Sequence, residues 1–124
     1  MLKATALAPA NIAFIKYWGQ KDKDLNLPFN DSISMNLDNC YTKTTVEFSE
    51  KYKNDEFLLK GSTLNKVEPL QRVVNFLDLI RKIAKTNLKA KIISQINFPS
   101  SSGIASSASG FAALTLAGIK ALGL

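Results

Sequence analysis

The strongest candidate for chemistry is a serine- and glycine-rich loop, PSSSGIASSASG, at residues 99–110. It lies between an apolar segment and a run of small residues that predicts a helix, so its amides are expected at a helix N-terminus. That end of a helix carries roughly half a positive charge and attracts anions. Gly103 permits close approach of a ligand, and Ser106, Ser107 and Ser109 can donate hydrogen bonds to phosphate oxygens or hold Mg²⁺. The loop lacks the Gly-Lys-Ser/Thr ending of a Walker A motif, and a polar linker is the alternative.

A second candidate is the group Lys16, Tyr17 and Trp18, which stands directly before Gly19. A lysine can neutralise a phosphate or carboxylate, and the hydroxyl of Tyr17 can donate a hydrogen bond. From the residue types alone, an exposed lysine on a strand is the simpler interpretation. A third stretch, at residues 26–38, offers polar groups that either bind a ligand or cap a turn.

Other chemistry is excluded by composition. The chain has no histidine, which removes the commonest general base, and its single cysteine, Cys40, removes intrachain disulfides and cysteine-rich metal sites. The 16 basic and 10 acidic residues give a formal charge of +6, which favours an anionic partner. Because no arginine-rich arm and no aromatic RNA-binding motif is present, we expect no nucleic-acid partner. We also expect no membrane partner and a cytoplasmic location, since the N-terminus makes a poor secretory signal.

The elements that must position these groups suggest a single α+β domain, as expected for 124 residues with 46% hydrophobic content. Alternating or β-branched segments predict strands at residues 3–8, 32–38, 42–49, 56–60 and 89–98. The segment at residues 11–18 has apolar residues at both odd and even positions, which predicts a strand buried on both faces. Pro9 predicts the end of the first strand, and the pair Asp38-Asn39 predicts a turn. Helical periodicity predicts helices at residues 66–86 and 108–122, the first stopping near Asn87 and the second capped by Gly123.

Together, these motifs resemble a known family. Residues Pro99–Ser109 are similar to the phosphate loop of the GHMP kinase superfamily, PxxxG[LI]xSSxS. NIAFIKYWG followed by LNLPFNDSISMNLD is similar to its decarboxylase branch, the diphosphomevalonate decarboxylases. The resemblance covers essentially the whole chain in the right order. It implies a GHMP-kinase N-terminal domain of the ribosomal protein S5 domain 2-like fold, incomplete here. Residues 1–124 would then be the N-terminal part of an ATP- and substrate-binding domain, without its C-terminal part and the second domain.

The resemblance also implies a reaction. ATP phosphorylates the 3-hydroxyl of 5-diphosphomevalonate, and phosphate then leaves with CO₂ to give isopentenyl diphosphate and ADP. ATP and Mg²⁺ are the implied cofactors, and a homodimer is the implied assembly of the full-length enzyme. The aspartate that acts on the 3-hydroxyl is expected beyond Leu124, so the isolated chain is expected to be inactive. The alternative outside the enzymes is a phosphate-binding fragment without catalytic activity.

Matching the family's motifs position by position assigns roles to individual residues. Lys16 and Ser107 would be catalytic, with Ser107 also near Mg²⁺. Substrate phosphates would be bound by Tyr17, Trp18, Gly19, Gln20 and Arg72. ATP would be bound by Pro99, Ser102, Gly103, Ala105, Ser106, Ser107 and Ser109. Gln20 departs from the family, which usually has lysine there, and this leaves phosphomevalonate decarboxylase or mevalonate 3-kinase as alternative activities.

Overall fold

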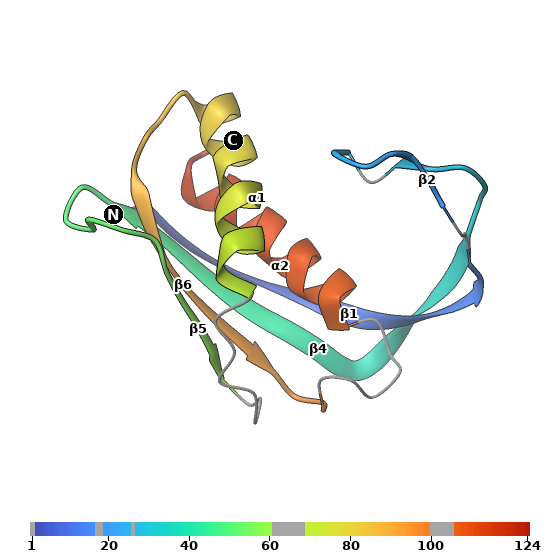
Figure 1. Ribbon diagram of the computed structural model, residues 1–124. Helices are drawn as coiled ribbons and strands as arrows, with labels where there is room; N and C mark the ends of the chain where they lie inside the picture. The colour runs from blue at the N-terminus through green and yellow to red at the C-terminus, as the bar shows by residue number, and fades with distance from the viewer. Residues whose placement is uncertain (1, 17–18, 26, 61–68, 100–105) are drawn as a thin grey trace.

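The structure is a computed structural model that describes residues 2–16, 19–25, 27–60, 69–99 and 106–124. It has two layers, a four-stranded sheet and two helices that cover one of its faces (Figure 1). The strands lie in the order β1 (Leu2–Ile15), β4 (Ile33–Ser49), β6 (Lys89–Ile96) and β5 (Glu56–Lys60). Only the β5–β6 pair is parallel among the strand pairs of the described residues. The helices are α1 (Pro69–Ala84) and α2 (Ser106–Ala121). The predicted α+β class is therefore confirmed.

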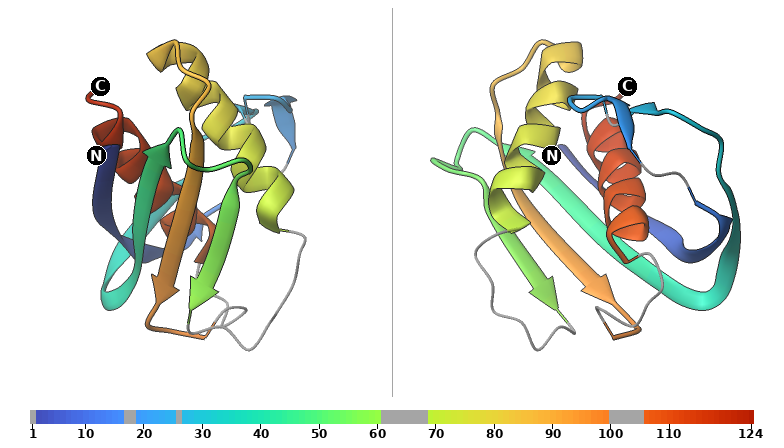
Figure 2. Two further views of the ribbon diagram at one scale, coloured as in Figure 1. Left: turned by 90° about the vertical axis from the view of Figure 1, so that its left-hand side faces the viewer. Right: turned by 45° about the vertical axis from the view of Figure 1, so that its right-hand side comes forward.

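The core residues lie between the sheet and the helices. Figure 2 shows both helices on the same face of the sheet. Alternate residues of β4 point toward the helices, and Val46 and Phe48 are fully or almost fully buried there. They pack with Ile92 of β6 and Leu77 of α1, which are also fully buried. The strand predicted at 42–49 and the first predicted helix therefore both contribute to the core, although Ile83 of α1 is 71% exposed.

Helix ends differ from the predictions in detail. The predicted start of the first helix, at residue 66, lies outside the described residues. It ends at Ala84 because Lys85 adopts a left-handed conformation, φ 53°. The amide of Thr86 bonds to the carbonyl of Arg81 at 3.1 Å, which closes the helix end before Asn87. In α2 the predicted glycine cap is confirmed, since Gly123 has φ 73°.

The predicted turn at Asp38-Asn39 is wrong, because β4 runs without interruption from Ile33 to Ser49. The two residues lie in an irregularity instead. The β1 partner changes from Pro9, opposite Tyr41, to Asn11, opposite Asn36, and Asn39 has φ 60°. A bulge of this kind bends a strand without ending it. Pro9 does not end its strand either, since β1 lies at the edge of the sheet, where a missing N–H is tolerated.

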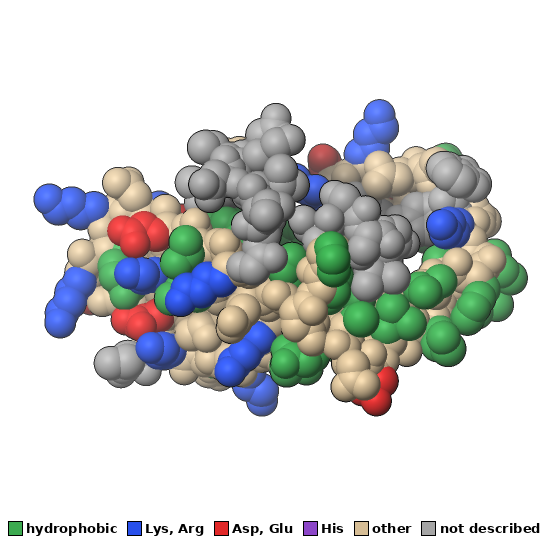
Figure 3. All heavy atoms as spheres, turned by 90° about the horizontal axis from the view of Figure 1, so that it is seen from below, with side chains coloured by type: hydrophobic (Ala, Val, Ile, Leu, Met, Phe, Trp, Pro, Cys, Tyr) green, Lys and Arg blue, Asp and Glu red, His purple; other side chains and the backbone are tan. Residues whose placement is uncertain are grey.

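Beyond this bulge the chain forms an arm, by which we mean the described residues between Asn11 and Asn36. Figure 1 shows it extending past the helices and curving up on the helix side of the sheet, with β2 (Gln20–Asp22) and β3 (Leu27–Pro28) at its far end. This short hairpin was not predicted; Asp22 Oδ1 holds its turn by accepting bonds from the amides of Asp24 and Leu25, both at 2.9 Å. The predicted burial of residues 11–18 is wrong for Ile12, Phe14 and Ile15, which are 39%, 63% and 51% exposed. Apolar side chains gather over the arm in Figure 3.

A buried ion pair fastens the opposite end of the fold. Arg81 is 5% exposed, and its guanidinium pairs with Asp55, just before β5, and with Asp78. Its Nε donates to the carbonyl of Leu88 at 2.8 Å, and Asp55 Oδ1 also accepts the amide of Ala90 at 2.8 Å. One arginine and one aspartate therefore tie the end of α1 to the starts of β5 and β6.

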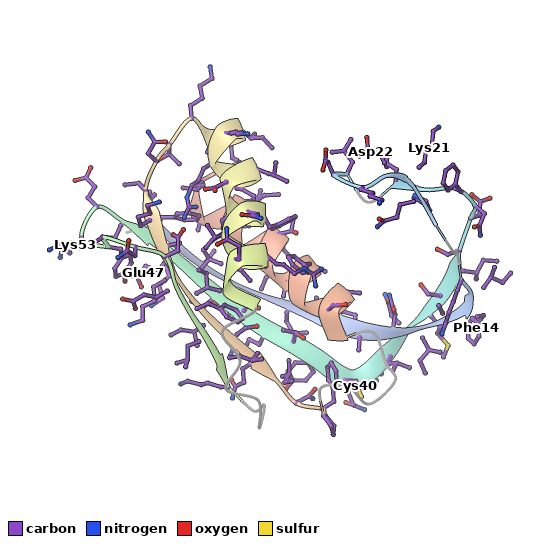
Figure 4. The ribbon with its side chains drawn as sticks, viewed as in Figure 1. Phe14, Lys21, Asp22, Cys40, Glu47 and Lys53 are labelled. Carbon is purple, nitrogen blue, oxygen red and sulfur yellow. The ribbon has the colours of Figure 1, made fainter. Side chains whose placement is uncertain are left out.

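At the same end of the sheet, Glu47 lies on the face without helices (Figure 4). The hydroxyl of Tyr52 donates to its Oε1 at 2.8 Å, and Lys3 Nζ lies 3.3 Å from its Oε2. The Tyr52 bond first, and Lys3 second, lower the pKa of Glu47, while the same bond raises the pKa of Tyr52. Because the pKa of Glu47 is lower in the folded state, its ionised carboxylate stabilises the fold at pH values above the ordinary glutamate pKa. This stabilisation is lost as the pH falls through the folded-state pKa of Glu47.

Candidate functional site

The serine-rich loop has the predicted position between a strand and a helix. Strand β6 ends at Ile96, Pro99 follows it, and α2 begins at Ser106. Ser107 is in the first turn of α2 and its side chain is exposed. Residues 100–105, which include the predicted Ser102, Gly103 and Ala105, lie outside the described residues. Their predicted contacts with ATP stay predictions.

A pocket of about 260 Å³ opens at the start of α2. Its floor is the sheet, with Thr42 and Thr44 of β4 and Ser94 and Ile96 of β6. Its walls come from β5 and the two helices, and they are Phe57, Leu59, Arg72, Val73, Ser107, Gly110, Phe111 and Leu114. The lining is mostly apolar, with one hydroxyl, one guanidinium and the hydroxyls of the floor. This combination suits a ligand that has a flat apolar part and an anionic part.

Arg72 is held at the pocket by an aromatic contact. Its guanidinium carbon lies 5.2 Å from the ring centre of Phe111, which packs edge to face against Phe76 at 5.3 Å. None of the ion pairs found among the described residues includes Arg72. The structure therefore brings together two of the predicted site residues, Arg72 and Ser107, from segments 35 positions apart in the sequence.

Each hydroxyl of the floor is paired with another hydroxyl. Ser109, which is 1% exposed, lies with its Oγ 2.8 Å from Thr42 Oγ1, and Thr44 Oγ1 lies 2.7 Å from Ser94 Oγ. These bonds join α2 to β4 and β4 to β6. The structure gives the side chain of Ser109 a contact with the sheet, and its predicted contact with ATP stays a prediction.

The other predicted residues lie on the arm. Lys16 follows β1 and is exposed, and Gln20 begins β2 opposite Pro28. Gly19 has φ 91°, and a Cβ atom there would lie 3.3 Å from the Phe29 ring, so this position favours glycine. Lys16, Gly19 and Gln20 do not line the pocket, and Tyr17 and Trp18 lie outside the described part of the chain. The site residues thus form two groups, one at the pocket and one on the arm.

Sequence reasoning missed the aromatic and aliphatic walls of the pocket, Phe57, Leu59 and Leu114, as functional residues. Their alternation or helical spacing predicts that they are core residues. Only the tertiary structure shows that they line an open pocket. Over the same described ranges, no group of three or more His, Cys, Asp or Glu side chains could hold a metal ion. None of the described helices is long and apolar enough to cross a membrane.

Comparison with known proteins agrees with the predicted family. The family model of the diphosphomevalonate decarboxylase-like N-terminal domain matches residues 8–124. The diphosphomevalonate decarboxylase of Candida albicans is 42% identical over 132 aligned positions, which cover 94% of this chain and 35% of that protein. The Schizosaccharomyces pombe enzyme is 44% identical, and 32% of its length is covered. This chain therefore spans about a third of the length of the relatives.

Solved structures give the same result. The mevalonate diphosphate decarboxylase from Staphylococcus aureus has a TM-score of 0.87 and 41% identity, with 97% of this chain and 36% of that chain covered. The Enterococcus faecalis enzyme has a TM-score of 0.88 and 45% identity, with 98% and 37% covered, and its structure is described as a mevalonate diphosphate mediated ATP binding mechanism. The GHMP-kinase-like fold predicted from the motifs is confirmed. Since the family model matches all but the first residues, the chain belongs to the diphosphomevalonate decarboxylase-like N-terminal domain family.

Proposed function

We propose that the native protein, meaning the complete polypeptide that contains residues 1–124, catalyses the ATP-dependent decarboxylation of 5-diphosphomevalonate to isopentenyl diphosphate. The observation that carries this proposal is the pocket at the start of α2, which combines Arg72 and Ser107 with an apolar wall. It adjoins the serine-rich loop, and a helix N-terminus of this kind favours phosphate. Relatives with this activity match 90% or more of the chain.

ATP would occupy the pocket side. The apolar wall made by Phe57, Leu59 and Phe111 suits the base of the nucleotide, while Ser107 and the loop amides would hold its phosphates. Arg72, held against Phe111, lines the same pocket, and we keep its predicted role of binding a substrate phosphate, at the side of the pocket where the two ligands would meet.

Diphosphomevalonate would occupy the arm side. Lys16 would neutralise charge on the substrate during phosphoryl transfer and decarboxylation, and the residues that follow it would bind the diphosphate. Gly19 allows the chain to turn sharply after this segment, and Gln20 contributes a neutral amide.

Magnesium fits this arrangement only as an ion carried by the nucleotide. Mg²⁺ prefers oxygen ligands and is commonly bound through substrate phosphates with few protein groups. Ser107 supplies one hydroxyl oxygen at the pocket. A neighbouring structure, that of MDDEF with MVAPP, AMPPCP and magnesium, contains both a nucleotide analogue and the metal. The homodimer and the cytoplasmic location stay predictions.

Gln20 favours a second candidate within the same family. A neutral side chain where lysine is usual suits a substrate with fewer phosphate charges, such as 5-phosphomevalonate or mevalonate. ADP release by the native protein, measured with mevalonate, its 5-phosphate and its 5-diphosphate, separates these activities. The proposal requires the highest kcat/KM with the diphosphate.

Gly103→Val in the native protein is expected to abolish ATP binding without unfolding the protein. A branched side chain would keep the phosphate-binding backbone away from the nucleotide. Calorimetric titration with ATP measures this, and circular dichroism checks the fold. Gly123→Asn is a matched control, because Gly123 caps the far end of α2 in a left-handed conformation that asparagine tolerates. Unchanged ATP affinity in a natively folded Gly103→Val protein would remove the residue from the site.

The isolated 124-residue chain is expected to release no CO₂ from diphosphomevalonate in the presence of ATP. Among its acidic residues, none stands in a motif that matches the family's catalytic aspartate. Labelled CO₂ released by a purified, mass-verified chain measures this directly. Sustained turnover would show that the chain contains its own general base.

A further inference from the structure

Asn97 completes the sheet at the point where the chain leaves it for the serine-rich loop. The last register pair of β4 and β6 is Thr42 with Ile96, so Asn97 stands opposite Tyr41. Its amide donates to the carbonyl of Tyr41 at 3.3 Å. In return the amide of Tyr41 donates at 2.8 Å to the side-chain Oδ1 of Asn97. The side-chain carbonyl takes the place of the main-chain carbonyl in a regular ladder, so the chain can turn toward Pro99 while the Tyr41 amide stays paired.

The second half of the same side chain holds the bulge of β4. Asn97 Nδ2 donates to the carbonyl of Asn39 at 2.7 Å. Asn39 is the residue with φ 60°, in the stretch where β4 shifts its register against β1 and the arm begins. Figure 4 shows this bend beside Cys40, below the start of α2. One asparagine side chain therefore bonds on both sides of Cys40.

On the other side of the loop, the start of α2 is also bonded to β4. Ser109 in α2 pairs with Thr42 at 2.8 Å in the buried interior. The two described segments that flank residues 100–105 are thus both attached to β4 between Asn39 and Thr42. This short stretch joins the pocket, with Ser107, to the arm, with Lys16.

We propose that Asn97 is a positioning residue, which fixes the pocket group of site residues relative to the arm group. This inference rests on the proposed function, in which ATP binds at the first group and the phosphate acceptor at the second. Phosphoryl transfer needs the two reactants in line, and small misplacements of reacting groups are costly in rate. Each group has its own local contacts, so each should still bind its ligand when Asn97 is removed.

The test is Asn97→Ala in the native protein, with kcat and both KM values measured for ATP and diphosphomevalonate. We expect kcat to fall roughly 10–100-fold, while each KM changes by less than about threefold. The number of sites per chain for AMPPCP with magnesium, measured by calorimetry, should stay unchanged. Hydrogen exchange at the amide of Tyr41 should become faster.

Two further variants sharpen the result. Asn97→Asp keeps an acceptor for the Tyr41 amide and loses the donor to Asn39, so its kcat should lie between those of the wild type and Asn97→Ala. Asn87→Ala removes an exposed asparagine at the opposite end of β6 and should leave kcat unchanged.

A wild-type kcat in Asn97→Ala would overturn the inference. So would a fall in kcat matched by an equal loss of AMPPCP sites, because the residue would then act only through the folded fraction. A wild-type protein with no turnover would refute the proposed function, and this inference would fall with it. The wild-type control distinguishes that failure from the first two.

Discussion

Lys16→Ala in the native protein is expected to lower kcat about 10²–10³-fold, the scale of losing one electrostatic stabiliser of a transition state. The reason is that negative charge moves between phosphate, hydroxyl and carboxylate during the reaction. An ammonium group that meets this charge mainly in the transition state contributes to kcat more than to KM. Initial rates over a range of diphosphomevalonate concentrations measure both constants.

The structure supports an available charge at this position. Lys16 is exposed at the end of β1, and the ion pairs of the described ranges do not include it. Lys53→Ala is the matched control, because Lys53 is an exposed lysine at the far end of the sheet from the arm (Figure 4). A raised KM with normal kcat would make Lys16 a simple binding residue. Normal values of both constants would leave it an exposed lysine on a strand.

Asp55→Ala is expected to lower the free energy of unfolding by about 3–5 kcal/mol, because it leaves the buried charge of Arg81 with only a half-exposed partner. The side chain of Asp55 is 4% exposed and also accepts the amide of Ala90, which would lose its acceptor. Denaturant unfolding followed by circular dichroism measures the loss.

Asp78→Ala is the matched control for this ion pair, since Asp78 contacts the same guanidinium with a carboxylate that is 52% exposed. Its loss should cost at most about 1 kcal/mol, as is usual for pairs in contact with solvent. Equal effects of the two substitutions would show that burial does not decide the strength of this network.

Local patterns predicted those elements whose signals are local. The apolar period of the first helix, the alternation of β4 and β6 and the cap at Gly123 all depend on neighbours within one or two turns or a single strand. The turn predicted from local pattern at Asp38-Asn39 was wrong. Polar residues that favour positive φ serve a turn and a bulge equally well, and the pairing of Pro9 with Tyr41 decided for the bulge.

Other features depend on residues that are far apart in the sequence. Arg81 meets Asp55 across 26 positions, and Asn97 reaches Asn39 across 58. The exposure of Phe14 could not be predicted either, because an apolar side chain does not reveal what covers it. The motifs predicted Lys16, Arg72 and Ser107 as site residues, and these roles stay predictions. Their division between the arm and the pocket required the fold.

The most direct test of the proposed activity is the ratio of CO₂ to ADP released by the native protein from carboxyl-labelled 5-diphosphomevalonate and ATP. Decarboxylation driven by phosphorylation of the 3-hydroxyl predicts one CO₂ for each ADP, and no CO₂ when ATP is omitted. ADP formation without CO₂ would instead identify a kinase, and the absence of both products with a folded, ATP-binding protein would contradict the proposed function.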